Sequence, residues 1–192
     1  MADSAAETAL IVPVELPPGL EALRGRSVED ADRGLPAHVT LIYPFLPARD
    51  LSDGVRDAIA AVVAAHAKFS YRLVGQGRWP ETLYASVEPE APFRALQADL
   101  AAAFHDYPLH GGAYDFVPHV TIAECEAARL PELADDPAWV ELPASATART
   151  VDLLVRTGDM WWTKSTFPLD STADLTTPGS EPLLNVTPGN AK

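Results

Sequence analysis

Two copies of one tetrapeptide pattern constrain this chain more than any other feature: His38-Val39-Thr40-Leu41 and His119-Val120-Thr121-Ile122, which begin 81 residues apart. The pattern is typical of a β-strand, in which side chains at positions i and i+2 share one face. The His and Thr of each copy therefore share a face, while the aliphatic residues pack into a core from the other. Two such strands facing each other place two imidazoles and two hydroxyls around one small cavity.

The recurrence exceeds what composition alone supplies. Five histidines and 13 threonines in 192 residues predict about 0.3 cases of His followed two positions later by Thr. The chain has two cases, and both have Val between the two residues and a branched aliphatic residue after them. One copy would be ordinary in a strand, whereas the pair indicates a shared function.

The composition indicates a folded protein that does not bind long nucleic acid. Hydrophobic residues make up 47% of the chain, enough to form the core of one domain or of two close lobes. The formal net charge is −13, whereas binding to a duplex or a long strand rests on neutralisation of phosphates by many Lys and Arg residues. We therefore expect a small phosphodiester substrate, either a nucleotide or an RNA terminus, and a monomeric protein.

Cysteine content and hydropathy predict neither a disulfide nor a membrane span. The single cysteine, Cys125, cannot form an internal disulfide, and no cysteine spacing typical of a metal site exists. The first eight residues lack the basic start and apolar run of a signal peptide, and no apolar stretch approaches membrane-spanning length. We expect a cytoplasmic protein with no membrane contact and no cofactor.

Hydrophobic periodicity and turn residues predict an α+β chain. Apolar or alternating runs predict strands over 8–16, 37–45, 69–79, 82–88, 119–125, 142–157 and 160–169. Helical spacing predicts helices over 50–66 and 91–106 and shorter ones over 20–24 and 126–134. Residues 1–170 are assigned to a single domain of two lobes. Residues 171–192, rich in Pro, Thr, Ser and Gly, are predicted to form a flexible tail.

The order of the predicted elements repeats after each motif: the motif strand, a helix and two further strands. We interpret the chain as a diverged duplication of β-α-β-β units related by a pseudo-twofold axis. Antiparallel sheets are expected to line a central cleft, with the helices outside. Residues 163–165 follow residues 82–84 by the same 81 positions that separate the motifs, and they lie inside the last predicted strand. The hairpins predicted over 69–88 and 142–169 are therefore expected to flank the two motif strands.

Two histidines and two hydroxyls in one cavity are suited to displacement at phosphorus. Histidine titrates near neutrality, so one ring can remove a proton from the attacking oxygen while the other donates a proton to the departing one. Each Thr hydroxyl can donate to a non-bridging phosphate oxygen. No metal is required, and two distant histidines without spaced carboxylates make a poor zinc set.

The paired motifs resemble those of the 2H phosphoesterase superfamily, most closely its bacterial RNA 2′,3′-cyclic phosphodiesterase branch, often labelled the 2′-5′ RNA ligase family. The resemblance rests on the segments 35–45 and 116–122 and covers roughly residues 8–169. It implies a bilobal fold with a central cleft and metal-independent hydrolysis of 2′,3′-cyclic or 2′,5′-type phosphodiesters. It also implies that His38 and His119 are the acid/base pair and that Thr40 and Thr121 bind the phosphate.

Several points stay open at this level. Tyr43, Tyr84 and Trp162 are candidate substrate-binding residues because aromatic rings stack on bases and because the strands of Tyr84 and Trp162 are expected to flank the motifs. Which of the two histidines is the acid and which is the base is not decided by a symmetric pattern. The alternatives are a nucleotide-binding or RNA-end-binding module with little turnover, and an enzyme that joins RNA ends through 2′-5′ linkages.

Overall fold

The computed structural model describes residues 6–107, 109 and 115–170, so the predicted tail over 171–192 lies outside the described residues. The strands are β1 (Thr8–Pro13), β2 (His38–Ile42), β3 (Phe69–Trp79), β4 (Thr82–Glu88), β5 (His119–Glu124), β6 (Ala144–Ala148), β7 (Thr150–Thr157) and β8 (Met160–Pro168). The α-helices are α1 (Pro18–Gly25), α2 (Asp53–Ala64), α3 (Ala91–Ala103) and α4 (Leu130–Ala134). Short 3-10 turns are η1 (Glu29–Ala31), η2 (Ala48–Asp50) and η4 (Pro137–Glu141).

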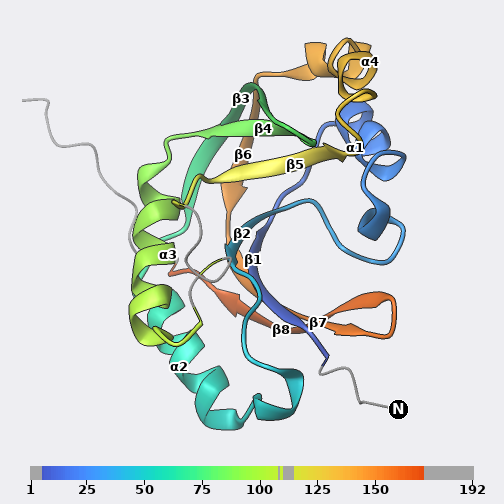
Figure 1. Ribbon diagram of the computed structural model, residues 1–192. Coiled ribbons are helices and arrows are strands. Elements are labelled where there is room, and N and C mark those ends of the chain that lie inside the picture. The colour runs from blue at the N-terminus through green and yellow to red at the C-terminus, as the bar shows by residue number, and fades with distance from the viewer. Residues whose placement is uncertain (1–5, 108, 110–114, 171–192) are drawn as a thin grey trace, which may run out of the picture.

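The strands form two antiparallel four-stranded sheets, as the sequence predicts (Figure 1). The β2 sheet has the order β2-β1-β7-β8, and the β5 sheet has the order β5-β4-β3-β6. Each motif strand is therefore an edge strand, and the two edges contact each other. Helices cover the outer faces: α1 packs on β5, α3 on β2 and α2 on β8. The α+β fold with a pseudo-twofold arrangement is confirmed.

The halves of the chain do not correspond to the two sheets, and this corrects one expectation. The hairpin β3–β4 pairs with β5, whereas β7 and β8 return to pair with β1 from the start of the chain. The predicted strand over 142–157 is two strands, because β6 joins the β5 sheet and β7 joins the β2 sheet. Hence β4 flanks the motif strand β5, but β8 is separated from β2 by two strands. Alternation predicts a strand but does not choose its partner.

One continuous core lies behind both sheets. The aliphatic residues of the two motifs, Val39, Leu41, Val120 and Ile122, are all completely buried in it. Because neighbouring side chains of a strand alternate between faces, their burial directs the His and Thr side chains to the opposite face. Burial of the motif's apolar positions therefore determines which face carries its polar groups.

Capping interactions hold the helices that support the motif strands. Helix α2 begins after Ser52, whose hydroxyl accepts a hydrogen bond from the Val55 N–H. At the start of α1, the Glu141 carboxylate accepts from the N–H groups of Gly19 and Leu20 at 3.1 and 3.0 Å. A carboxylate at that end also favours the helix dipole. In the described part of the chain, no helix is long and apolar enough to cross a membrane.

Candidate active site

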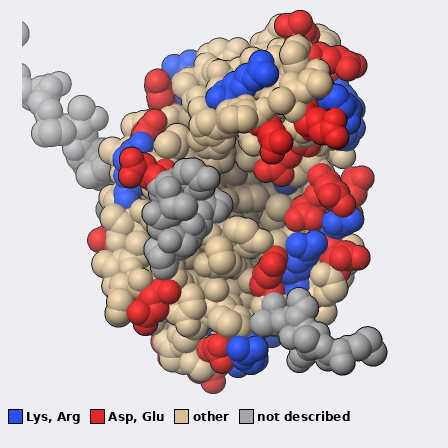
Figure 2. Space-filling model, viewed as in Figure 1, with Lys and Arg blue, Asp and Glu red and all other residues tan. Residues whose placement is uncertain are grey.

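The two motif histidines begin the two adjacent edge strands. His38 is the first residue of β2 and His119 is the first residue of β5. Each ring is partly buried, and the charge of His119 affects the titration of His38, so the two rings share one electrostatic environment. Figure 2 shows the surface hollowed in the middle of the molecule, where β5 approaches β1 and β2. Charged side chains gather on the rim of this face rather than in its centre.

Strand register shows which residues share the face of the motif polar groups. In the β2 sheet, His38 pairs with Pro13 and Thr40 pairs with Ile11. In the β5 sheet, His119 pairs with Ser86 and Thr121 pairs with Tyr84. Residues directly opposite each other on antiparallel strands point to the same side. Pro13 and Ile11 therefore accompany one motif, whereas a hydroxyl and an aromatic ring accompany the other.

The His38 ring is fixed by two hydrogen bonds within its own segment. Its Nδ1 lies 2.8 Å from the Pro36 carbonyl oxygen, and its Nε2 lies 3.0 Å from the Thr40 hydroxyl. A carbonyl only accepts, so in the neutral ring Nδ1 carries the proton and Nε2 has a lone pair that accepts from Thr40. The resting geometry therefore presents a proton acceptor at Nε2.

Burial favours the neutral form of His38. It lowers the pKa of His38 to about 4, and the positive charges of Arg24 and His119 act in the same direction. The hydrogen bond to the Pro36 carbonyl opposes this shift, because a carbonyl stabilises the charged ring. At neutral pH the imidazole is consequently unprotonated and competent to accept a proton.

The His119 ring has a similar backbone contact but different neighbours. Its Nδ1 lies 2.7 Å from the Val117 carbonyl oxygen, two residues upstream, as in the other motif. The rings of Trp79 and Tyr84 lie edge-on to the imidazole, with centroids 4.6 and 5.3 Å away, and are 4.3 Å from each other. Trp79, Tyr84 and His119 form a group that we call the aromatic cluster. Trp79 keeps 37% of its surface exposed, so the cluster is open to solvent.

A glycine makes room for this cluster. Gly77 pairs with Tyr84, and a Cβ atom at Gly77 would overlap the tyrosine ring, well inside van der Waals contact. No side chain other than hydrogen fits at this position while the ring stays in place. Gly75, two residues earlier on the same strand, has open space around the equivalent point.

Residues 12–160 match the 2′-5′ RNA ligase superfamily, and the matched segment contains both motifs. The chain belongs to this superfamily. The resemblance to the 2H phosphoesterases drawn from the two motifs is thereby confirmed. No curated protein matches the chain.

Solved structures of other proteins share the superfamily fold. Protein TT0787 of Thermus thermophilus is 20% identical, with a TM-score of 0.58, over 86% of this chain and 99% of that one. Escherichia coli LigT complexed with 3′-AMP is 16% identical, with a TM-score of 0.55, over 85% of this chain and 98% of that one. At these identities the likeness shows the fold alone.

The three candidate aromatic residues occupy different environments. Tyr84 lies beside Thr121 and in the aromatic cluster. Tyr43 follows β2, at the opposite end from His38; its hydroxyl donates to Glu7 and its ring contacts Trp161 edge-on. A substrate-binding role for these two residues stays a prediction.

Trp162 does not flank a motif strand, contrary to the expectation. It lies on β8, where it pairs with Val155 and is 59% exposed. The neighbouring Trp161 is buried with Ile11 and Leu154, on the face that carries Thr40. Since consecutive residues alternate, Trp162 points to the other side of the sheet. The expectation was wrong because it rested on the offset of 81 residues between the motifs. That offset does not determine which strands pair in a sheet.

Two further side chains, Trp79 and Asp152, lie on the motif faces. Gly77 pairs with Tyr84, and Trp79 lies two residues further along β3, so Trp79 is on the same face as Tyr84. The alternation of the predicted hairpin already implies this placement. Asp152 pairs with Ile11, which pairs with Thr40, and so lies on the same face two strands away. Burial raises the pKa of Asp152, against hydrogen bonds from Thr166 and Thr150. A single Asp in an apolar strand does not by itself indicate that the residue lies on the face of the motif polar groups.

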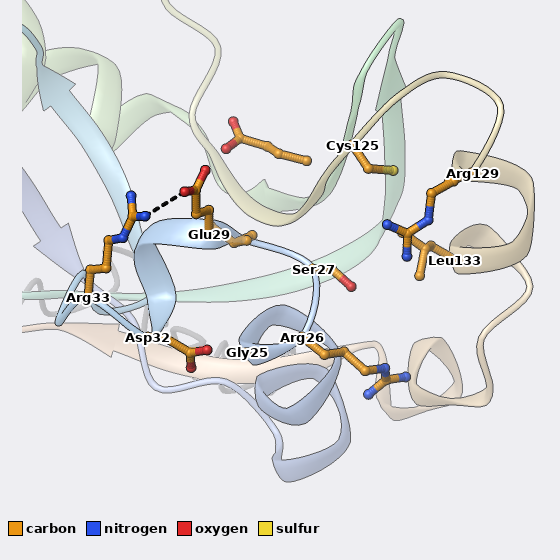
Figure 3. Close-up of a pocket in the computed structure, with 11 residues that line it drawn as sticks. Gly25, Arg26, Ser27, Glu29, Asp32, Arg33, Cys125, Arg129 and Leu133 are labelled. Atoms are coloured by element: carbon orange, nitrogen blue, oxygen red, sulfur yellow. Dashed lines mark hydrogen bonds and ion pairs between the residues drawn. The ribbon is translucent and has the colours of Figure 1, made fainter. Parts of the chain in front are cut away.

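A separate pocket of about 450 Å³ lies beyond the end of β5 (Figure 3). One wall comes from the connection between α1 and β2, and the other from the segment after β5, including Cys125 and Arg129. Two of its arginines are engaged in ion pairs, Arg33 with Glu29 and Arg26 with Asp136. None of the motif residues line this pocket. Its lining carries three arginines and three carboxylates, so its charges are largely balanced.

Proposed function

We propose that the chain is a phosphodiesterase that opens a nucleoside 2′,3′-cyclic phosphate, or a related 2′,5′-type diester, at the site between β2 and β5. The observation that carries the proposal is the meeting of the two motif strands at the edges of their sheets. We infer that this arrangement brings two imidazoles and two hydroxyls to one hollow. In-line displacement at phosphorus needs a base and an acid on opposite sides of the phosphate.

We assign the general base to His38. Its ring is neutral at pH 7, and the Pro36 carbonyl holds the Nδ1 proton. The Nε2 lone pair accepts from the Thr40 hydroxyl in the resting structure and becomes available to the attacking water when that hydroxyl turns to the phosphate. His119 then acts as the general acid, with its charged form supported by the Val117 carbonyl at Nδ1. Thr40 and Thr121 donate hydrogen bonds to the non-bridging phosphate oxygens.

The proposed step conserves protons. The water oxygen forms a bond to phosphorus while the bond from phosphorus to one ribose oxygen breaks. His38 takes a proton from the water, and His119 gives a proton to the departing ribose oxygen. The product is a nucleoside monophosphate. His38 then releases a proton to solvent and His119 takes one up, which restores both rings.

The substrate is proposed to be a small nucleotide or an RNA end in the cytoplasm. The net charge of −13 disfavours a long polyanion. Escherichia coli LigT, which shares the fold, has been solved with 3′-AMP, with NADP⁺ and with ATP. In this chain the exposed ring of Trp79, supported by Tyr84, offers a surface on which a base can stack beside His119.

A substrate screen tests the proposal. The purified chain is incubated in EDTA with the four nucleoside 2′,3′-cyclic phosphates and with short 2′,5′-linked oligomers, and products are separated by chromatography. The variant with both His38→Ala and His119→Ala is the blank. We expect ring opening by the wild type at a rate at least about a hundredfold above the blank. Tight binding of nucleoside monophosphates with no turnover of any diester would instead identify a binding module.

A further inference from the structure

Arg24 is an unusually buried cation, and its ion pair with Glu21 is long. It lies in the last turn of α1 and is only 2% exposed. The Glu21 carboxylate is 3.8 Å away and is itself about half exposed. Removing a guanidinium from water is unfavourable unless its donors are satisfied. The partners of this guanidinium therefore indicate what its burial accomplishes.

Those partners are the backbone carbonyls just before the first motif. Arg24 Nη2 donates to the Leu35 carbonyl at 2.8 Å and to the Pro36 carbonyl at 3.1 Å. The Pro36 carbonyl is also the acceptor for His38 Nδ1, at 2.8 Å. A single backbone oxygen thus connects the buried cation to the imidazole.

The second motif has a counterpart of this contact. Arg94, on α3, donates to the carbonyl of Phe116, which precedes His119 by three positions, as Leu35 precedes His38. Arg94, however, is exposed and paired with Glu90. An arginine thus contacts each of the two segments, but only the one beside His38 is buried.

We propose that Arg24 is a positioning residue for His38: it holds the Pro36 carbonyl in place and, through that oxygen, fixes the orientation and tautomer of the imidazole. With Nδ1 bonded to a fixed carbonyl, Nε2 is directed toward Thr40 and the space between the sheets. The contact also places a permanent positive charge near the ring, which opposes its protonation.

Other charged groups near this pair are few in the described part of the structure. His38 is affected by Arg24 from α1 and by His119 from β5, and both disfavour its protonation. Arg24 in turn is affected by Glu21 on its own helix and by Glu124 at the end of β5. The carboxylates thus act on the arginine rather than on the imidazole. Removal of the Arg24 charge is therefore expected to raise the pKa of His38.

The Arg24→Met variant tests the proposal, with Arg94→Met as the matched control. The His38 ring is titrated by NMR between pH 3.5 and 8 without substrate, and its signals are assigned with His38→Gln. We expect Arg24→Met to raise the pKa of His38 by about half a unit or more, and Arg94→Met to leave it unchanged. An unmoved titration in folded Arg24→Met, or an equal shift in Arg94→Met, would overturn the proposal.

Kinetics supply a second readout, which rests on the proposed phosphodiesterase activity. For Arg24→Met we expect kcat to fall about tenfold, with KM within about twofold, and the acidic limb of the pH profile to move with the His38 titration. Because the titration needs no substrate, a failure of the proposed activity is distinguishable from a failure of this inference.

Arg24→Lys keeps the proposal testable if Arg24→Met does not fold. Lysine retains the charge but cannot match the planar guanidinium in its contact with two carbonyls. We expect the pKa of His38 to stay near its wild-type value while kcat falls, because orientation rather than charge is lost. Wild-type kcat together with an unchanged proportion of the Nδ1–H tautomer in Arg24→Lys would overturn the positioning role.

Discussion

The surroundings of the two motif histidines differ more than the motifs themselves. Both rings begin an edge strand, and both place Nδ1 against a carbonyl two residues upstream. His38 lies beside Pro13 and near a buried arginine, whereas His119 lies beside Ser86 and against two aromatic rings. The backbone contact of the ring is thus the same at the two motifs, while the neighbouring side chains diverge. The divergence provides a physical basis for dividing the acid and base roles between two otherwise equivalent groups.

The largest expected effect comes from removing either ring. His38→Ala and His119→Ala should each lower kcat toward a 2′,3′-cyclic nucleotide by at least about two orders of magnitude. A nitrophenyl phosphodiester separates the two roles, because its leaving group departs without a proton. On that substrate His119→Ala should recover to within about tenfold of the wild type, whereas His38→Ala should not. The opposite pattern would reverse the assignment of acid and base.

The ionisation of His38 should make the fold less stable in acid. The folded pKa of His38 is about 4, below the ordinary value of 6.5. Between these values the unfolded chain binds a proton that the folded chain does not, so the free energy of unfolding falls as the pH drops. The loss is absent above pH 6.5 and levels off near pH 4, at about 3 kcal/mol in total.

Urea denaturation at a series of pH values measures this contribution of His38. The quantity compared is the free energy of unfolding of the wild type minus that of His38→Gln. The difference should shrink or change sign as the pH falls through that window, because His38→Gln removes the ionisation. A difference that stays constant from about pH 7 to about pH 4 would contradict the low folded pKa of His38.

A smaller effect is expected at the glycine beneath the aromatic cluster. Gly77→Ala places a methyl group inside the ring of Tyr84 and should lower the stability by about 1–3 kcal/mol, with a rise in KM. Gly75→Ala is the matched control, since no atom lies within 4 Å of its added Cβ. Thermal unfolding and steady-state kinetics of the two variants give the comparison. Equal effects at both positions would show that the rings do not require Gly77.

A last comparison distinguishes two exposed tryptophans. If a base stacks on Trp79 beside His119, Trp79→Ala should weaken binding by about 1–3 kcal/mol, most visibly in KM. Trp162→Ala should leave KM within about twofold of the wild type, because Trp162 is on the other side of its sheet. Fluorescence titration with nucleoside monophosphates measures the same difference without turnover. Loss of binding in Trp162→Ala alone would refute the placement of the base.

Local patterns in the sequence predicted most of the elements and the motif geometry. The hairpin β3–β4 has the predicted bounds, and α2 lies within the helix predicted over 50–66. The sharing of one face by His and Thr followed from alternation alone. Such features depend on residues within a few positions of one another, which the sequence displays directly.

Features that depend on distant pairing were not predictable in the same way. The break between β6 and β7 lies inside one apolar run and appears only because the two strands join different sheets. Trp161 and Trp162 are adjacent in the sequence, so which of them is buried depends on the register of β8 against β7, which contains an irregularity. An arginine in the last turn of a helix is ordinary for the helix dipole, so nothing in the sequence marks Arg24 as buried.

The sequence by itself determined the two strands, the polar face of each and the chemistry that those polar groups can perform, because a strand's alternation is a local property of the backbone. The tertiary structure alone decided that the strands meet edge to edge, that one imidazole lies beside a buried cation and the other beside aromatic rings, and that the two therefore differ. Those outcomes depend on which segments pair across the chain, and pairing is selected by the burial of the whole core rather than by any one segment.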